Sequence, residues 1–330
     1  MKIPNQLRLS LERELRRHDG AALARAAASL SAHYRGGNHA ATDARQPIMA
    51  LAYAATRMPA TFAATSAALA ALATGLPDFT PRTLLDVGAG TGTALWSAVS
   101  RWPKLEAADL IERDPLMLAL GERLAAPIGN AVTNIRWLHA DLLGPWQAVP
   151  HELVTATYVL GELHAAAQTA LVARLWALTA GALLLVAPGT PQGWASIRSA
   201  RAQLCAAGAQ LVAPCPHAAH CPLPADPTAD WCHFAQRLAR TKAHRSAKGA
   251  DLGYEDEKYA YLAVARQAGQ RVGARVLRHP VTRPGRIELT LCTHDGLRRS
   301  IVTRAERAAW RLARDLAWGD GVAPEALLGA

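Results

Sequence analysis

The chain has 330 residues, of which 51% are hydrophobic and 19% are charged. This composition excludes a disordered protein, and the length predicts one core domain with additions. The net charge of +10 is localised, because residues 233–311 hold 17 Lys and Arg against 7 Asp and Glu, while the rest is balanced. Clustered cations favour a surface that binds the phosphates of a nucleic acid, since each phosphate contact releases counterions and so increases the affinity. A solvated face in an arginine-rich chain is the alternative.

Residues 1–77 are predicted to form a helical cap. Leucines and charged residues alternate with helical spacing in the first segment, and Pro59 interrupts the last one. Residues 58–77 carry no charge and approach the length of a membrane span, but their small side chains favour a buried helix. No apolar segment typical of a secretory signal is visible near Met1, so we expect a cytoplasmic protein without a membrane partner.

Residues 78–192 alternate between strand and helix patterns. The strand segments are RTLLDVGAGTG, AADLIERD, NIRWLHADLL, ELVTATYVLGEL and GALLLVAPGTP. Strands that alternate with helices predict a parallel sheet with right-handed crossovers. The sequence therefore predicts a doubly wound α/β domain.

Residues 193–330 are predicted to be a Cys-rich and basic extension. A helix over 193–207 leads to a stretch rich in Cys, Pro and His at 213–233, and a basic segment and a strand near 258–266 follow. Asp295-Gly296 joins RIELTLC to LRRSIVTR, which indicates a hairpin because both turn residues tolerate positive φ. A helix over about 304–317 is expected to close the fold.

A glycine loop follows the first strand of the α/β domain. Gly88, Gly90 and Gly92 allow close approach of a ligand to the backbone, at the place where such sheets bind cofactors. A dinucleotide loop would carry its third glycine at position 93, where a threonine stands. This loop, with Asp86 before it, resembles the first motif of S-adenosylmethionine-dependent methyltransferases, in which the acid helps to hold the methionine end of the cofactor.

Two further acids follow the next two strands. Glu112 is placed to accept hydrogen bonds from both ribose hydroxyls, and Asp141 matches the acid that faces the adenine amino group in those enzymes. Each alone is compatible with a helix cap or a surface carboxylate. Three acids at successive strand ends beside a glycine loop predict cofactor binding.

The five cysteines stand at positions 205, 215, 221, 232 and 292. Without a secretory signal we expect no disulfides. Prolines follow Cys215 and Cys221, and proline-stiffened loops that direct thiolates to one centre are typical of zinc and cluster sites. The spacing lacks a CxxC pair, so buried free thiols stay an alternative.

The segments LVAPGTPQGW, APCPH, CPL, DWCHFAQR and LGYEDEKYAYL resemble the family of methyltransferase-like proteins of the small ribosomal subunit, found in bacteria and mitochondria. The resemblance covers about residues 44–305. It implies a class I methyltransferase fold, association with the small ribosomal subunit or its rRNA, and a 4Fe–4S cluster. By position the ligands would be Cys215, Cys221, Cys232 and Cys292, with Cys205 incidental. Zinc is the alternative metal, with His217, His220 or His233 as further ligands.

The chemistry stays open at this stage. Ala187 stands where the family pattern leads us to expect an acid, and TYVLGEL lacks both the Asn-Pro-Pro run and the cysteine nucleophile of known methyltransferase classes. Glu162 and His164 are candidate bases, but we favour a helix-start carboxylate and a surface histidine as their explanation. The hypotheses are an rRNA methyltransferase, a non-catalytic assembly or RNA-binding factor, and a redox sensor. The catalytic residue, the target nucleotide and the oligomeric state do not follow from the sequence.

Overall fold

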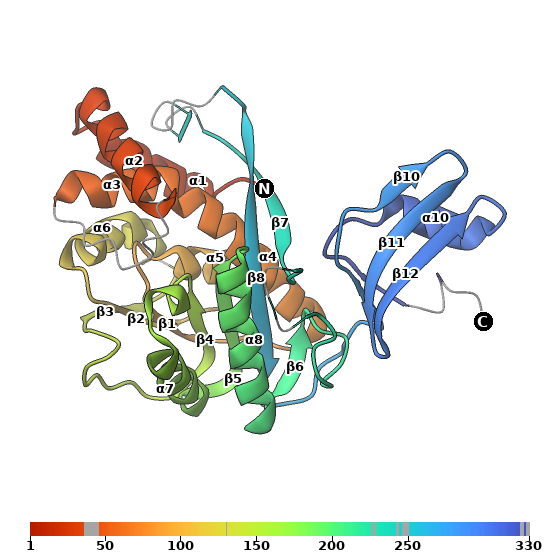
Figure 1. Cartoon of the computed structure of the whole chain (residues 1–330). Coiled ribbons are helices and arrows are strands. Elements are labelled where there is room, and N and C mark those ends of the chain that lie inside the picture. The colour runs from red at the N-terminus through yellow and green to blue at the C-terminus, as the bar shows by residue number, and fades with distance from the viewer. Residues whose placement is uncertain are drawn as a thin grey trace.

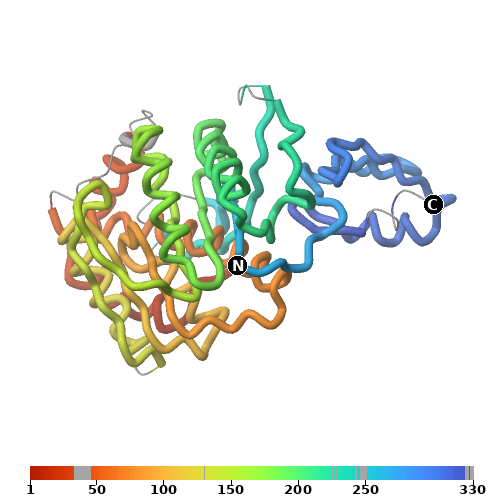
Figure 2. Tube along the Cα trace, turned by 90° about the horizontal axis from the view of Figure 1, so that it is seen from below, coloured from red at the N-terminus to blue at the C-terminus, as the bar shows by residue number. Residues whose placement is uncertain are grey.

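The protein is described by a computed structural model over residues 1–35, 46–129, 131–224, 226, 229–241, 244–245, 251–323 and 327. A large body with a central sheet is followed by a smaller C-terminal body with its own sheet (Figures 1 and 2). The cysteine-rich loop, residues 214–233, connects two strands of the first sheet, β6 and β7.

The central sheet has eight strands in the order β3-β2-β1-β4-β5-β8-β6, with β7 paired to β8. Strands β1 to β5 run parallel, and β8 runs antiparallel to its neighbours. The predicted doubly wound parallel arrangement is therefore confirmed for the first five strands. The strands are β1 (Thr83–Val87), β2 (Ala107–Glu112), β3 (Asn134–His139), β4 (His151–Thr157), β5 (Thr179–Pro188), β6 (Gln210–Ala213), β7 (Phe234–Ala239) and β8 (Tyr254–Ala265).

Helices cover both faces of this sheet, because alternate strand residues point to opposite sides. Leu84 belongs to the core shared with the N-terminal helices, whereas Leu85 belongs to the core under α7 and α8. On the first side lie α1 (Asn5–Leu15), α2 (Gly20–Arg35), α3 (Pro47–Thr56), α4 (Met58–Gly75), α5 (Thr93–Arg101), α6 (Pro115–Ala125) and the short η1 (Ala126–Ile128). The second side is formed by η2 (Leu160–Glu162), α7 (Ala165–Ala177) and α8 (Pro191–Ala206).

Helix α4 is the one helix within the described ranges that is long and apolar enough to cross a membrane, and 67% of that window is buried inside the fold. It packs against α5 and strands β6 to β8. Its alanines allow this close packing, as the sequence predicts. The predicted interruption falls at Arg57, between α3 and α4, with Pro59 in the first turn of α4.

The C-terminal body is a second sheet covered by one helix. Its order is β10-β11-β9-β13, with β12 paired to β11. Leu289 and Val302 pack with Ala313 of the helix in a separate core. The predicted hairpin between β11 and β12 is confirmed, with Gly296 at φ +118° and paired with Thr293, whereas Asp295 does not adopt a positive φ. The elements are β9 (Ala274–Val276), β10 (Val281–Arg283), β11 (Arg286–Thr293), β12 (Gly296–Thr303), α10 (Arg307–Asp315) and β13 (Gly321–Val322).

The central sheet continues past residue 192, where the sequence places the start of the extension. Helix α8 and strands β6, β7 and β8 belong to the large body, so residues 193–330 do not form one unit. The reason is long-range pairing: β8 inserts between β5 and β6, and Leu185 lies opposite Leu262. Local sequence patterns carry no information about such a partner.

Candidate functional site

The glycine loop lies between β1 and α5, with Gly88, Gly90 and Gly92 at φ +74°, +55° and +83°. Such values disfavour other residues, so the backbone itself requires glycine here. A Cβ on Gly88 would also lie 2.6 Å from Val159 Cγ2, whereas one on Gly90 would meet nothing closer than Met117 Cε at 3.7 Å. The space beside Gly90 is therefore the more open side of the loop.

Glu112 at the end of β2 fastens this loop. Its carboxylate accepts hydrogen bonds from the Gly90 and Asp114 backbone N–H groups, at 2.7 and 2.8 Å. Burial raises the pKa of Glu112 in spite of these bonds. The structure thus brings Glu112 and the loop together, as predicted.

Asp86 is fully buried at the end of β1. Its Oδ1 accepts a hydrogen bond from the Thr155 hydroxyl at 2.8 Å, whereas no partner for Oδ2 exists among the described residues. Burial raises the pKa of Asp86 to about 7; the Thr155 bond opposes this, and the charge of Glu112 adds to it. A buried carboxylate oxygen without a partner is costly, which makes it a natural acceptor for a cationic ligand group.

Asp141 follows β3 and is exposed. Its Oδ1 accepts the Leu143 N–H at 2.9 Å, and Ala140 beside it donates to the Glu112 carbonyl at 3.1 Å. Since β1, β2 and β3 are neighbours in the sheet, all three acids and the glycine loop meet at one edge. We call this set the carboxyl edge.

Tyr158, directly after β4, is a feature that sequence reasoning missed. It has φ +63°, which is uncommon for a tyrosine and marks a strained position. Its hydroxyl donates to Glu257 Oε1 of β8 at 3.1 Å. Burial raises its pKa well above the usual value, and the charge of Glu257 adds to this. The pair connects the end of β4 to β8, which lie on either side of β5 in the sheet, so no local sequence signal predicts it.

The other candidates near β4 and β5 have structural roles. The His164 side chain accepts the Ala167 N–H at 3.4 Å and so caps α7. Glu162 lies in the short helix η2. Ala187 is buried in the core under α8, as an apolar residue would be. These placements agree with the structural interpretation of each residue.

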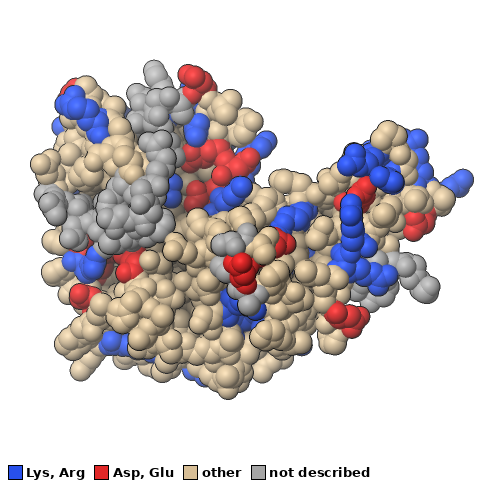
Figure 3. All heavy atoms as spheres, in the orientation of Figure 1, with Lys and Arg blue, Asp and Glu red and all other residues tan. Residues whose placement is uncertain are grey.

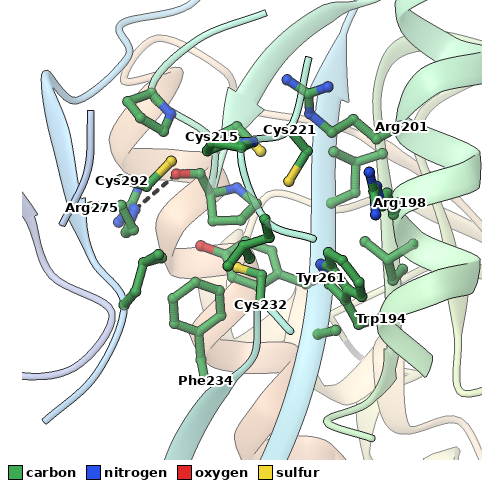
Figure 4. A pocket seen from close by; sticks show the side chains of 18 of the residues that line it. Trp194, Arg198, Arg201, Cys215, Cys221, Cys232, Phe234, Tyr261, Arg275 and Cys292 are labelled. Carbon is green, nitrogen blue, oxygen red and sulfur yellow. Dashed lines mark hydrogen bonds between the residues drawn. The ribbon is translucent and has the colours of Figure 1, made fainter. Parts of the chain in front are cut away.

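Four cysteines line one cavity, which we call the cysteine cavity. Cys215 and Cys221 lie in the loop after β6, Cys232 lies just before β7, and Cys292 lies on β11 of the second sheet. Figure 4 shows the four side chains around this space, with Trp194 and Tyr261 of the large body among the walls. All five cysteines are free thiols. Cys205 lies on α8 and is not part of the lining.

The thiols influence one another. Burial raises the pKa of Cys232 well above its usual value, and the charges of Cys215, Cys221 and Cys292 raise it further. Burial likewise raises the pKa of Cys292 to about 12, with further contributions from Cys215 and Cys221. Thiols that raise one another's pKa in this way lie close together. They lose their protons readily only when a bound cation balances the negative charge of the thiolates.

Two buried arginines support the cavity. Arg275 of β9 donates to the Pro214 carbonyl at 2.9 Å, which joins the second sheet to the cysteine loop (Figure 4). Arg201 of α8 donates to the carbonyls of His217 and Ala219, at 2.9 and 2.7 Å. Burial raises the pKa of Cys215, and the Arg201 charge opposes this. The cavity therefore has positive charge beside its thiols.

Of the three histidines considered as zinc ligands, His217 is the one that lines the cavity, with Nε2 at 3.7 Å from Cys292 Sγ. His220 is exposed, and the His233 ring stacks on Trp231. Within the described ranges, no group of three or more Cys, His, Asp or Glu side chains has the geometry of a single-ion site.

Comparison with known proteins identifies a matching family and two relatives. The chain matches the family described as "Mitochondrial small ribosomal subunit Rsm22" over residues 47–323. It is 29% identical to the human protein "Ribosome assembly protein METTL17, mitochondrial", over 82% of this chain and 62% of that one. It is 25% identical to the fission yeast "Rsm22-cox11 tandem protein 2, mitochondrial", over 72% of this chain and 38% of that one. The chain thus spans less than two thirds of either relative.

Solved methyltransferase structures are similar to this chain at low sequence identity. One is a putative RNA methyltransferase from Pyrococcus horikoshii, 13% identical, with a TM-score of 0.39 over 60% of this chain and 81% of that one. Another is magnesium protoporphyrin IX methyltransferase from Synechocystis, 12% identical, with a TM-score of 0.41 over 63% and 80%. The strand order, rather than these scores, is the ground for the class I fold.

The predicted cytoplasmic localisation is wrong, because the matched family and both relatives are described as mitochondrial. The cytoplasmic prediction was based only on the lack of a visible secretory signal near Met1, and no motif in the sequence supported it. The family resemblance drawn from the cysteine and β5 motifs is confirmed, and the match covers more than half of the sequence. The chain belongs to the Rsm22 family of the mitochondrial small ribosomal subunit.

Proposed function

We propose that this protein binds S-adenosylmethionine at the carboxyl edge and acts on or with the rRNA of the small ribosomal subunit. The observation that carries the proposal is the buried Asp86 Oδ2, an acceptor without a partner in the described structure, below a glycine loop that Glu112 holds in place. An ammonium group beside Asp86 would compensate this oxygen.

The other residues of the carboxyl edge suit the rest of the cofactor. Glu112 would bind the ribose hydroxyls, the open side of Gly90 would admit the backbone of the ligand, and the exposed Asp141 would face the adenine amino group. Bound S-adenosylmethionine would supply an electrophilic methyl group. The protein residues named here bind and orient it.

A non-catalytic assembly factor with the same fold is the second candidate. It is favoured by the structural roles of His164 and Glu162 and by the apolar Ala187, which together leave no evident base after β4. The family and the human relative, described as a ribosome assembly protein, are compatible with either function.

We further propose that the cysteine cavity holds a 4Fe–4S cluster through Cys215, Cys221, Cys232 and Cys292. A zinc ion needs all its ligands about 2.3 Å or less from one point, whereas irons and sulfides occupy the space between cluster ligands. Cysteine thiolates are the usual ligands of such clusters, and four cysteine side chains line this one cavity. Four thiolates exceed the positive charge of a cluster core, and Arg201 and Arg275 lie where they can balance the remainder.

The test has two readouts. Calorimetry with purified protein should detect S-adenosylmethionine binding, and mapping of methylated rRNA positions in a deletion strain should separate the two candidate functions. A methylation that disappears with the gene and returns with the wild-type chain, but not with Gly90→Leu, supports the methyltransferase. Cofactor binding without any missing methylation supports the assembly factor. No cofactor binding would contradict the assignment of the carboxyl edge and the methyltransferase function.

The proposed RNA contact rests on the basic excess of residues 233–311, but its first part is already engaged. Arg237 pairs with Asp256 at 2.7 Å and Arg240 pairs with Glu255 at 2.8 Å. Lys242 and Lys248, which the basic segment also includes, lie outside the described residues. The arginines that follow, on the second sheet, are therefore the better-defined candidates.

A further inference from the structure

The second sheet has one covered face and one open face. Helix α10 packs on the face that carries Leu289, Leu291 and Val302. The alternate residues of the same strands point the other way. On that side, the side chains of Val281, Leu297 and Ile301 are among the most exposed large apolar residues of the described chain, at 45%, 45% and 50% exposure. We call this side the open face.

Three arginines converge on one glutamate at the open face. Glu288 of β11, whose side chain is 9% exposed, lies 2.5 Å from Arg299, 3.1 Å from Arg286 and 3.4 Å from Arg283. The Arg299 hydrogen bond holds the pKa of Glu288 below its usual range. The arginine side chains themselves remain 50% to 73% exposed. We call this set the arginine cluster.

The cluster has the features of a phosphate site. One carboxylate among three guanidinium groups leaves a net charge of +2. Each guanidinium has five N–H donors, and only some can face Glu288, so the rest point to solvent. Glu288 already orients the three arginine side chains. Binding of an anion would therefore cost these side chains less conformational entropy than binding to three independent arginines.

Strand register places apolar side chains directly beside the cluster. Val281 of β10 and Ile301 of β12 are the two cross-strand neighbours of Glu288. Further along the same face, Leu297 lies opposite Cys292, which lines the cysteine cavity. Figure 3 shows Lys and Arg side chains gathered on this C-terminal body, with little acidic surface among them. Phosphate-binding cations next to exposed apolar side chains suit a nucleotide chain, whose sugars and bases can pack on the apolar positions.

We propose that the open face of β10, β11 and β12 is an RNA-binding surface, on which Arg283, Arg286 and Arg299 hold phosphates and Val281, Leu297 and Ile301 pack against sugars or bases. This inference rests on the proposed association with rRNA and names the surface that makes the contact. The positive charge of the arginine cluster excludes a basic partner. An acidic protein is the competing occupant, and the experiment must distinguish it from RNA.

The experiment compares two triple variants of the full chain that remove the same charge from opposite faces of one sheet. Arg283, Arg286 and Arg299 are changed to Gln in the first, and Arg307, Arg311 and Arg314 of α10 are changed to Gln in the second. The probe is a labelled single-stranded RNA oligonucleotide of mixed sequence, measured by fluorescence anisotropy over a range of salt concentrations. Circular dichroism and thermal unfolding serve as the folding control for both variants, because the second sheet has a core of its own.

In a plot of the logarithm of the RNA association constant against the logarithm of the salt concentration, the open-face triple should make the slope less steep by roughly 2. Each of the three lost phosphate contacts contributes about 0.7 on single strands. At 0.1 M salt this corresponds to a loss of affinity on the order of 100-fold. The α10 triple should change the slope by less than one contact. Replacing Leu297 and Ile301 with Ser should weaken binding at every salt concentration without changing the slope, because apolar contacts release no counterions.

Equal losses in the two triples would overturn the assigned surface and leave the proposed function intact, because RNA binding would then follow total charge alone. Poly-glutamate tests the competing occupant. If it binds more strongly than RNA, displaces the RNA, and loses this ability in the open-face triple, the open face binds an acidic protein instead. Failure of the wild-type chain to bind any RNA would overturn the rRNA part of the proposed function itself.

Discussion

The carboxyl edge and the cysteine cavity differ in how their parts are distributed along the chain. The acids and glycines of the carboxyl edge come from three successive strand ends within residues 86–141. The cysteines come from two sheets, and Cys292 is 60 positions away from Cys232. A site built on successive strands is positioned by the sheet alone, whereas the cavity depends on how a second body packs against the first. The two sites should therefore respond differently to substitution.

The largest effect is expected at the cysteine cavity. Anaerobically purified protein should be brown and contain iron and acid-labile sulfide. Changing Cys215, Cys221, Cys232 or Cys292 singly to Ser should remove most of the metal and destabilise the protein, because the remaining buried thiolates would lose their compensating cation. Iron and sulfide analysis with thermal unfolding measures both effects.

Cys205→Ser is the matched control, since Cys205 lies on α8 away from the cavity lining, and it should retain the cluster. Zinc without sulfide in protein made under iron-replete, anaerobic conditions would contradict the cluster but keep the site. Metal lost in Cys205→Ser and kept in Cys292→Ser would show that the fourth ligand is wrongly assigned.

At the carboxyl edge the next largest effect is expected for Gly90→Leu, which should abolish S-adenosylmethionine binding in calorimetry. The leucine side chain would fill the open side of the loop. Gly90→Ala is the control: its Cβ meets nothing closer than 3.7 Å, so it should cost only the roughly 1 kcal/mol of a left-handed backbone and retain weakened binding. Equal affinity of Gly90→Leu and wild type would refute the cofactor site.

Asp86 should give the ligand-free protein a pH-dependent stability. Because its pKa is raised to about 7, the folded protein binds one more proton at Asp86 than the unfolded chain between about pH 4 and pH 7. The contribution of Asp86 to the free energy of unfolding therefore falls as pH rises through this window, by on the order of a few kcal/mol. Denaturant unfolding of Asp86→Asn should show this pH dependence removed.

The same substitution should have the opposite effect on the cofactor. An ammonium group binds the ionised carboxylate, so wild-type affinity should increase from pH 6 to pH 8, and Asp86→Asn should bind weakly with a flatter profile. A variant that is more stable at pH 8 and binds the cofactor as tightly as wild type would mean that Asp86 is structural. This outcome would leave the cysteine cavity unaffected.

The smallest effect is expected for Tyr158→Phe, which removes the hydroxyl that donates to Glu257. A hydrogen bond of this kind contributes about 1 kcal/mol, so the free energy of unfolding should fall by roughly that amount. Glu257→Gln, which keeps an acceptor, should fall less. If neither variant changes stability but Tyr158→Phe alters rRNA methylation, the strained residue belongs to the acceptor site rather than to the scaffold.

Prediction from the sequence was most successful where structure is local. The sequence predicted, in the correct order, the three strands that end at the glycine loop, at Glu112 and at Asp141. Each was found because a run of apolar residues indicates a buried strand. The hairpin at Asp295-Gly296 was predicted from its turn residues. The membership of β6, β7 and β8 in the central sheet was missed, since it depends on pairing between residues such as Leu185 and Leu262.

The sequence by itself determined the α/β core, the glycine loop with its three acids, and, through the family resemblance, which four cysteines belong together. Only the tertiary structure decided that Asp86 Oδ2 lacks a partner among the described residues, that Tyr158 meets Glu257, and that Arg275 joins the second sheet to the cysteine loop. It also divided the arginines between an open face and a helix. The physical reason is that backbone propensity and apolar periodicity act within a few residues, whereas burial, charge coupling and sheet pairing depend on segments that meet only after folding.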